Sequence, residues 1–143
     1  MATDVGLTAR AEFGDTMNIL VTGANGQLGT ELRNVTAGSR NNYIFSDVTS
    51  LPGVETLNLD ITNIDAVRIV CDSEKVDVIV NCAAYTNVDK AEDEPSMAML
   101  LNCTAAGNLA KVAAERDAAL IHISTDYIFH GDIPMPCKED WPT

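Results

Sequence analysis

The chain has 143 residues, of which 46% are hydrophobic and 21% charged, a size and balance typical of one globular domain. Its 21 acidic residues against nine Lys and Arg give a net charge of −12, which argues against nucleic acid and anionic membrane surfaces as partners, because both bind through clustered cations. No apolar run reaches the ~20 residues that cross a bilayer, so we expect a cytoplasmic protein. The four cysteines form no Cys-x-x-Cys pair, and we expect reduced thiols and no metal site.

Short apolar runs alternate with helical patterns from Met17 onward, whereas residues 1–16 have no periodicity and are expected to be a disordered leader or a cloning remnant. Strands are predicted over residues 18–22, 43–46, 55–59, 76–80 and 119–123. Helical stripes cover residues 28–35, 61–70 and 95–116, the second opening on Thr62 and Asp65 in the manner of a capping box and the third on Pro95. This order predicts an α/β fold, a Rossmann-like doubly wound parallel sheet with strand order 3-2-1-4-5.

The first predicted strand runs into a glycine-rich turn that reads G-x-x-G-x-x-G and leads directly into the first helix. Small residues let the backbone approach a pyrophosphate, and free N–H groups with the helix dipole favour its negative charge. The sequence therefore predicts a dinucleotide site, with a purely structural turn as the alternative. The candidate cofactor-binding residues of this turn are Gly23, Asn25, Gly26, Gln27, Leu28 and Gly29.

Two acidic residues follow the next predicted strands. Asp47 ends the second strand, where a carboxylate accepts hydrogen bonds from the adenosine ribose and favours NAD over NADP. Asp60 and Ile61 follow the third strand, where the chain can lie against adenine. The alternatives are a solvated turn aspartate for Asp47 and a helix cap for Asp60.

Two further segments end the fourth and fifth strands, at the edge where open α/β sheets bind ligands. Ala83 and Ala84 are small enough for a nicotinamide ribose to lie against the backbone, and Thr125 places a hydroxyl nearby. Asn102, in the long helix, either organises a strand end or bonds locally. His122 alternates with apolar residues and is expected to be a core or helix-facing histidine.

These segments resemble the extended short-chain dehydrogenase/reductases, and among them the dTDP-4-dehydrorhamnose reductase family, over residues 17–143. The matching strings are Met17–Gly23, Asn81–Glu92, Asn102 with Gly107–Ala110, and His122–Phe129. The resemblance implies hydride transfer from NADP(H) or NAD(H) to the C4 keto group of a dTDP-sugar, dTDP-4-dehydro-L-rhamnose, which weakens the NAD preference drawn from Asp47. It also admits Mg²⁺, with no ligands that we can place, and a homodimer.

The resemblance assigns roles to individual residues. It implies that Thr125 polarises the substrate carbonyl and that the cofactor lies against the segment 83–86. The residues implied are Tyr85 and Thr86 for the cofactor, and Thr86, Val88 and Tyr127 for the substrate. Packing aromatics are the alternative for Tyr85 and Tyr127, and a satisfied loop hydroxyl for Thr125.

The chain departs from the family at the Tyr-x-x-x-Lys pair that supplies the proton. Tyr127 is followed four residues later by Gly131. We expect the pair and the substrate domain beyond Thr143, so that residues 17–143 are an incomplete cofactor domain without reductase activity of their own. The alternatives are a nucleotide-binding regulatory subunit resembling that of methionine adenosyltransferase, or a cofactor-binding module alone.

Overall fold

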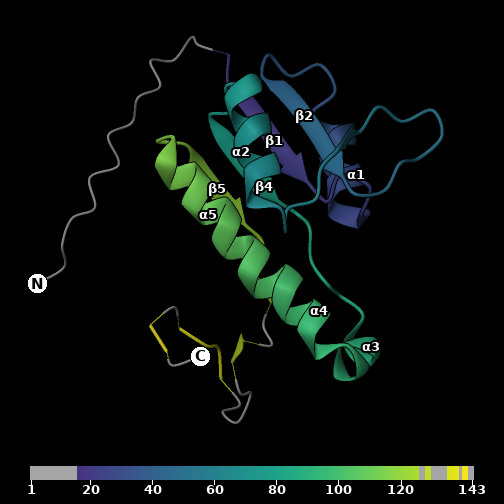
Figure 1. Cartoon of the computed structure of the whole chain (residues 1–143), viewed down its shortest axis with the longest axis vertical. Helices are drawn as coiled ribbons and strands as arrows, with labels where there is room; N and C mark the ends of the chain where they lie inside the picture. Colours follow the sequence, from purple (N-terminus) through teal and green to yellow (C-terminus); the bar gives the residue numbers. More distant parts are fainter. Residues whose placement is uncertain (1–15, 126–127, 130–134, 139, 142–143) are drawn as a thin grey trace, which may run out of the picture.

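The structure is a computed structural model that describes residues 16–125, 128–129, 135–138 and 140–141, and the expectations for Tyr127 and for the leader up to residue 15 lie outside these residues. Strands and helices alternate along the chain (Figure 1). The strands are β1 (Asn18–Thr22), β2 (Asn42–Asp47), β3 (Leu57–Asn58), β4 (Val78–Asn81) and β5 (Ala119–His122). The helices are α1 (Gln27–Val35), α2 (Ile64–Ser73), α3 (Val88–Asp93), α4 (Pro95–Met99), the π-helix η1 (Leu100–Ala105) and α5 (Ala106–Glu115).

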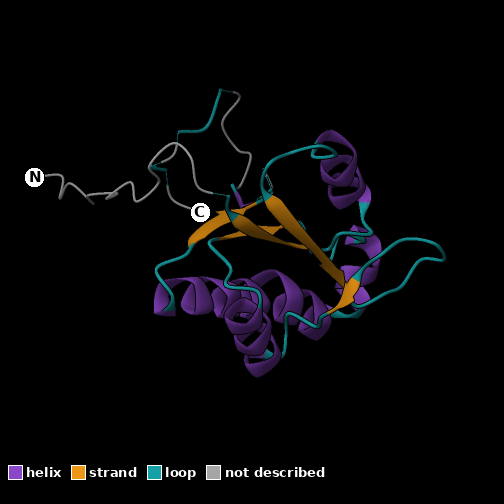
Figure 2. Cartoon of the chain, turned by 90° about the horizontal axis from the view of Figure 1, so that it is seen from above, coloured by secondary structure: helices purple, strands orange, loops and turns teal. Residues whose placement is uncertain are grey.

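The described strands form one parallel sheet in the order β3-β2-β1-β4-β5, which confirms the predicted Rossmann-like order. Helices lie on both faces of this sheet, as Figure 2 shows. Parallel strands joined by helical crossovers bring their carboxyl ends to one edge of the sheet. The glycine turn after β1 and the segment after β4 therefore start beside each other.

β1 is the centre of the sheet, and its side chains alternate between two apolar layers. Leu20 is fully buried in the layer beneath α2 and α5, together with Ile79, Val67 and Leu109. Val21 faces the opposite layer, where Leu32 of α1 packs. This alternation is the period of two that a strand covered on both faces requires.

Some elements differ from the sequence prediction. β3 spans only Leu57–Asn58 because pairing with β2 is limited to two residues. On α1 the predicted apolar stripe is buried only in part, since Val35 is 74% exposed. Of the two positions predicted for His122, core or helix-facing, the core position is wrong: the residue is exposed, because β5 is the edge of the described sheet and only one of its sides is paired.

The prediction that Thr62 opens the second helix is also wrong. Asn63 is the N-cap of α2, and its side chain accepts a hydrogen bond from Ala66 N–H at 3.1 Å. Thr62 instead donates to Asp60 through its backbone N–H and its hydroxyl, at 2.9 and 2.7 Å. An amide oxygen caps a helix as well as a hydroxyl does, which the two-residue motif does not reveal.

The long helix predicted from Pro95 is divided into α4, η1 and α5. Pro95 occupies its first turn as expected. The π-helical turn in the middle widens the helix where Asn102 faces the segment after β4. Single π-turns inside helices occur preferentially at functional sites.

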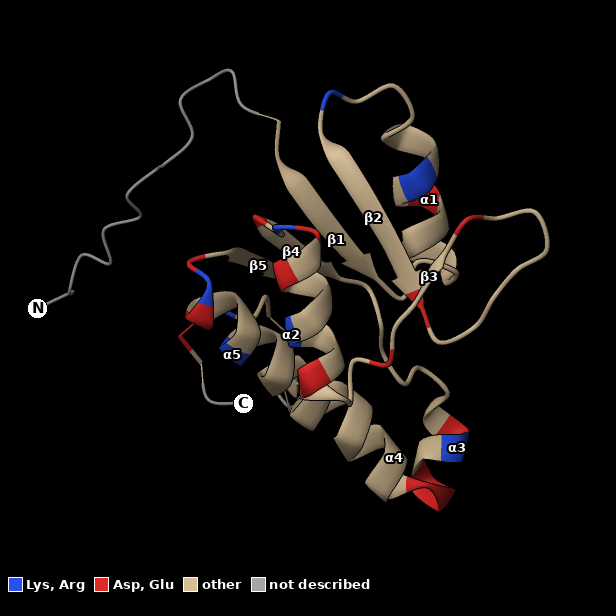
Figure 3. Ribbon diagram, turned by 45° about the horizontal axis from the view of Figure 1, so that its top comes forward, with Lys and Arg blue, Asp and Glu red and all other residues tan. Residues whose placement is uncertain are grey.

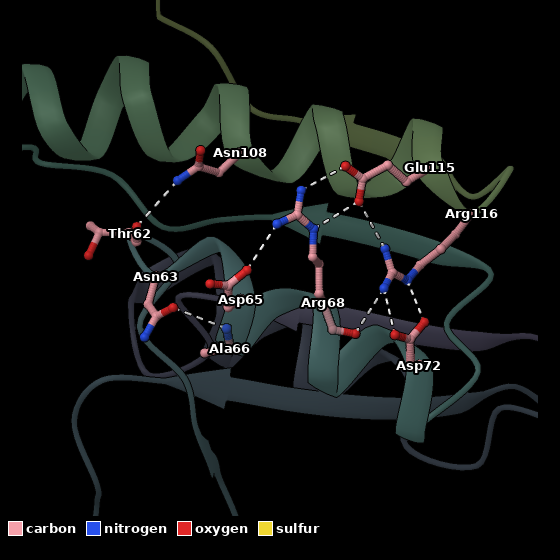
Figure 4. A network of polar contacts seen from close by, with 9 residues as sticks. All are labelled: Thr62, Asn63, Asp65, Ala66, Arg68, Asp72, Asn108, Glu115 and Arg116. Carbon is pink, nitrogen blue, oxygen red and sulfur yellow. Dashed lines mark hydrogen bonds and ion pairs between the residues drawn. The ribbon is translucent and has the colours of Figure 1, made fainter.

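Charged side chains join α2 to α5 on the surface of the domain (Figure 4). Arg68 contacts Glu115 at 2.8 Å and Asp65 at 2.9 Å, and Arg116 contacts Asp72 at 2.7 Å. The Arg68 guanidinium lowers the pKa of Glu115 to about 2. These pairs fix the packing of the two helices that cover one face of the sheet. In the described part of the chain no helix is both long and apolar enough to span a membrane.

Candidate functional site

The glycine turn packs so closely that two of its glycines admit no side chain. Gly23 has a φ of +66°, and a Cβ there would lie 2.5 Å from the backbone nitrogen of Ala83. A Cβ on Gly29 would lie 2.5 Å from the Cα of Ala24. Gly26 is different, since its backbone is in an ordinary region and its Cβ would meet only Gly23 O at 3.3 Å. The packing of the chain therefore requires Gly23 and Gly29, whereas a Cβ at Gly26 would be tight against a single atom, the Gly23 carbonyl oxygen.

Three amide groups of the turn are already engaged within the chain. Their hydrogen bonds run from Ala24 to Ser46 O at 3.0 Å, from Asn25 to the Asp47 carboxylate at 3.1 Å, and from Gly26 to Gly23 O at 3.1 Å. The amides of Gln27, Leu28 and Gly29 open α1, where a helix provides no internal acceptor, and Gly26 supplies no side-chain cap. The amides of the first turn of α1, which the sequence prediction already includes, are therefore the ones available to an anion.

Asp47 lies at the carboxyl end of β2 and faces the glycine turn. Burial would raise the pKa of its carboxyl, but hydrogen bonds from the Thr49 amide and hydroxyl and from the Asn25 amide outweigh burial and hold this pKa below its usual range. Asp47 is therefore ionised at neutral pH, and it is not the purely solvated turn aspartate considered as the alternative. Acidic residues, red on the ribbon in Figure 3, also occur in the loops around this end of the sheet.

A cavity of about 210 Å³ lies among the turn, β2, the start of the 59–61 segment and the segment after β4. Its lining comprises Gly23, Gly26, Asp47, Val48, Leu59, Asp60, Ile61, Cys82, Ala83, Ala84 and Leu101. The structure thus brings together predicted residues from four separate segments. Burial raises the pKa of the Cys82 thiol, so this part of the wall is uncharged.

Other predicted residues do not line the cavity. The side chain of Asn25 bonds to the 49–56 loop, and Leu28 is 41% exposed on α1. Thr86 and Thr125 are exposed near the same edge of the sheet, and Val88 is the first residue of α3 and 60% exposed.

Sequence reasoning missed four lining residues, namely Val48, Leu59, Cys82 and Leu101. Val48, Leu59 and Cys82 stand next to predicted residues, so an extension of each motif by one position would have included them. Leu101 comes from η1, and no local signal places it beside a turn almost 80 residues earlier.

Asn81 is a buried polar side chain that ties three strand ends together. Its Oδ1 accepts from Thr22 Oγ1 at 2.6 Å and from Ala83 N–H at 3.1 Å, while Nδ2 lies 3.0 Å from His122 Nδ1. A buried amide with its partners satisfied fixes local geometry strongly. Asn81 thereby sets the course of Ala83 along the cavity wall.

Asn102 organises the strand end and does more than bond locally, which decides between the two alternatives for it. Its Oδ1 accepts from Tyr85 N–H at 2.7 Å and its Nδ2 donates to Tyr85 O at 3.0 Å. The Tyr85 hydroxyl donates to Glu94 at 2.9 Å, and Lys90 pairs with the same carboxylate at 3.1 Å. Desolvation and Glu94 raise the pKa of Tyr85, so its hydroxyl is a poor proton donor to any substrate.

A second hollow of about 440 Å³ runs along the outer side of α4 and η1. Its lining is Pro95, Ser96, Met99, Leu100 and Thr104, with no ionisable side chain. It therefore lacks the groups that a charged ligand needs. Among the described residues no cluster of His, Cys, Asp and Glu could hold a metal ion.

Comparison with known proteins gives consistent matches. The family model of the RmlD substrate binding domain matches residues 17–143. A dTDP-4-dehydrorhamnose reductase of Mycolicibacterium smegmatis is 45% identical over 111 residues, which are 78% of this chain and 31% of that protein. The chain thus spans about a third of the length of that relative.

Solved structures match in the same way. A dTDP-4-dehydrorhamnose reductase ortholog of Clostridium acetobutylicum superposes with a TM-score of 0.78 at 40% identity, covering 87% of this chain and 41% of the other. The Bacillus anthracis reductase in complex with NADP superposes with a TM-score of 0.72 at 35% identity, covering 86% and 41%. The similarity therefore includes both the sequence motifs and the arrangement of the sheet.

Proposed function

We propose, because the chain belongs to the family of the RmlD substrate binding domain, that residues 17–143 are the NAD(P)H-binding part of a reductase acting on a dTDP-linked 4-keto sugar. The relatives named above are dTDP-4-dehydrorhamnose reductases, and one of them is in complex with NADP. The reaction proposed for the whole protein is reduction of the C4 keto group of dTDP-4-dehydro-L-rhamnose to dTDP-L-rhamnose.

The observation that carries this proposal is the cavity at the carboxyl ends of the strands. A dinucleotide site needs backbone N–H donors for the pyrophosphate and an acceptor for the hydroxyl groups of the adenosine ribose. It also needs small residues beside the nicotinamide end of the cofactor. The first turn of α1 provides the amides, Asp47 the acceptor, and Ala83 with Ala84 the small wall. Space at Gly26 fits a ligand lying across the turn, because no side chain of the protein uses it.

The remaining chemistry is assigned to residues after β4 and β5. When bound, NAD(P)H supplies the hydride that reduces the ketone. We propose that the Thr125 hydroxyl donates a hydrogen bond to the substrate carbonyl, and that Thr86 and Val88 contact the sugar. Tyr85 is engaged by Glu94, and none of Tyr43, Tyr85 and Tyr127 has a lysine four residues later. The general acid is therefore not among residues 17–143, and these residues alone are proposed to bind without turnover.

The test is a fluorescence titration of NADPH with the 143-residue chain, together with its Gly26→Ala variant. Gly26 lines the cavity, and a methyl group there would have one close contact within the chain, with Gly23 O at 3.3 Å. Overpacking of about 1–3 kcal/mol against the cofactor predicts binding that is weaker by about fivefold or more. Gly107→Ala is the matched control, since a Cβ there meets nothing within 4 Å. Equal affinity of Gly26→Ala and Gly107→Ala would place the cofactor elsewhere. Addition of dTDP-4-dehydro-L-rhamnose should cause no NADPH oxidation above a no-protein control.

A further inference from the structure

Three donors of the chain already occupy the Asp47 carboxylate. The Thr49 amide and hydroxyl both donate to Oδ1, at 2.9 and 2.8 Å, and the Asn25 amide donates to Oδ2 at 3.1 Å. An ionised carboxylate offers about four acceptor positions in total. Oδ1 is therefore filled, which leaves Oδ2 as the oxygen that can accept a hydrogen bond from a ligand. The backbone N–H of Val48 further stabilises the carboxylate and helps to lower its pKa.

This arrangement limits how Asp47 can recognise a ribose, an inference that rests on the proposed function. An acidic residue at this position selects NADH by accepting hydrogen bonds from the ribose hydroxyls, and it repels the 2′-phosphate of NADPH. With Oδ1 filled, Asp47 accepts one ribose hydroxyl and not two. Its charge is also partly balanced by three N–H and O–H dipoles, so repulsion of a phosphate is reduced.

We propose that Thr49 is a specificity-determining residue, whose hydroxyl occupies Asp47 Oδ1 and so makes the site accept both NADH and NADPH. Thr49 acts through Asp47 and is a positioning residue. It is exposed and does not line the cavity, whereas Asp47 and Val48 do.

The glycine turn fixes Thr49 in this position. The Asn25 side chain donates to Thr49 O at 2.7 Å and accepts from the Thr56 hydroxyl at 3.2 Å. It therefore joins the two ends of the 49–56 loop. The Thr49 hydroxyl donates to Asp47 and also accepts a longer hydrogen bond from Asn25 Nδ2 at 3.4 Å. Removal of that hydroxyl leaves the shorter bond from Asn25 to the Thr49 carbonyl in place.

The test is isothermal titration of NADH and NADPH into the 143-residue chain and its Thr49→Val and Thr49→Ser variants. Valine has the shape of threonine without the hydroxyl, so Oδ1 becomes available to a second ribose hydroxyl. The ratio of the NADPH Kd to the NADH Kd should rise about fivefold, the value of one ordinary hydrogen bond. Serine keeps the hydroxyl, and its ratio should stay within about twofold of the parent chain.

An Asp47→Ala background separates this mechanism from direct contact between Thr49 and the cofactor. There the Thr49→Val change should leave the ratio unchanged, because both oxygens of the carboxylate that it acts through are gone. An unchanged ratio for Thr49→Val in the parent background overturns the inference, as does an equal shift in both backgrounds. Failure of the parent chain to bind either cofactor refutes instead the proposed function on which the inference rests.

Discussion

Two helical glycines should respond to the same substitution with opposite signs. At Gly29 of α1, an alanine Cβ would lie 2.5 Å from both Ala24 Cα and Gly23 O. These are backbone atoms, so α1 must move away from the turn by about 1 Å to reach ordinary contact distance. Overpacking of this kind costs about 1–3 kcal/mol, against a gain in helix propensity of about 1 kcal/mol. We expect Gly29→Ala to lower the free energy of unfolding, by up to about 2 kcal/mol.

Gly107 of α5 is the matched control. It is exposed, and a Cβ there meets nothing within 4 Å. Only the propensity and the entropy of the unfolded chain then change, so Gly107→Ala should raise the free energy of unfolding by about 0.5–1 kcal/mol.

Urea unfolding followed by circular dichroism measures both effects. With m-values of about 1–3 kcal/mol/M, the midpoints of the two variants should lie on opposite sides of the parent midpoint, separated by about 1 M. If Gly29→Ala is as stable as Gly107→Ala, α1 does not pack on the turn as described. That result would refute the close approach on which the site geometry depends.

Three further substitutions test other parts of the fold. Asn102→Ala removes two hydrogen bonds to the Tyr85 backbone and should lower the free energy of unfolding, measured in urea, by about 1–3 kcal/mol. Asn102→Asp keeps the acceptor and should lower it less. Equal losses for the two variants would contradict the presence of both bonds. Asn63→Ala should cost about 1 kcal/mol and Asn63→Asp almost nothing, so an unchanged thermal midpoint for Asn63→Ala would exclude it as the cap. Arg68 lowers the pKa of Glu115 to about 2, so the parent chain should be more stable than Arg68→Met above about pH 4.5. This difference in the free energy of unfolding should decline as the pH falls toward 2. A difference that does not depend on pH would rule out the ion pair.

The sequence predicts the strands and their order because each central strand is an apolar run followed by a recognisable turn. β1 and the glycine turn after it are a local pattern, and so is the Ala83–Ala84 segment after β4. Local patterns of this kind identify each strand and the segment that follows it. Because the strands are parallel, the segments after their carboxyl ends lie at the same edge of the sheet.

Features that depend on contacts between distant segments could not be predicted. The wall residue Leu101 and the Asn102 clamp reach the site from η1, and their roles depend on how a helix packs across the sheet. The hydrogen bond from the Asn25 amide to the Asp47 carboxylate also forms only because the ends of β1 and β2 lie side by side in the sheet. The sequence does not reveal that this amide is already occupied. The exposure of His122 follows from the edge position of β5, which its alternating sequence pattern does not encode.

The most direct test of the cofactor site is ¹H–¹⁵N NMR of the labelled 143-residue chain during titration with NADPH. We expect the largest amide shifts at the start of α1 and in the segment after β4, with little change along the α2–α5 surface. The residues concerned are Gln27, Leu28, Gly29, Ala83 and Ala84. Largest shifts along the α4–η1 hollow, or no shifts in a folded chain at millimolar NADPH, would contradict this expectation.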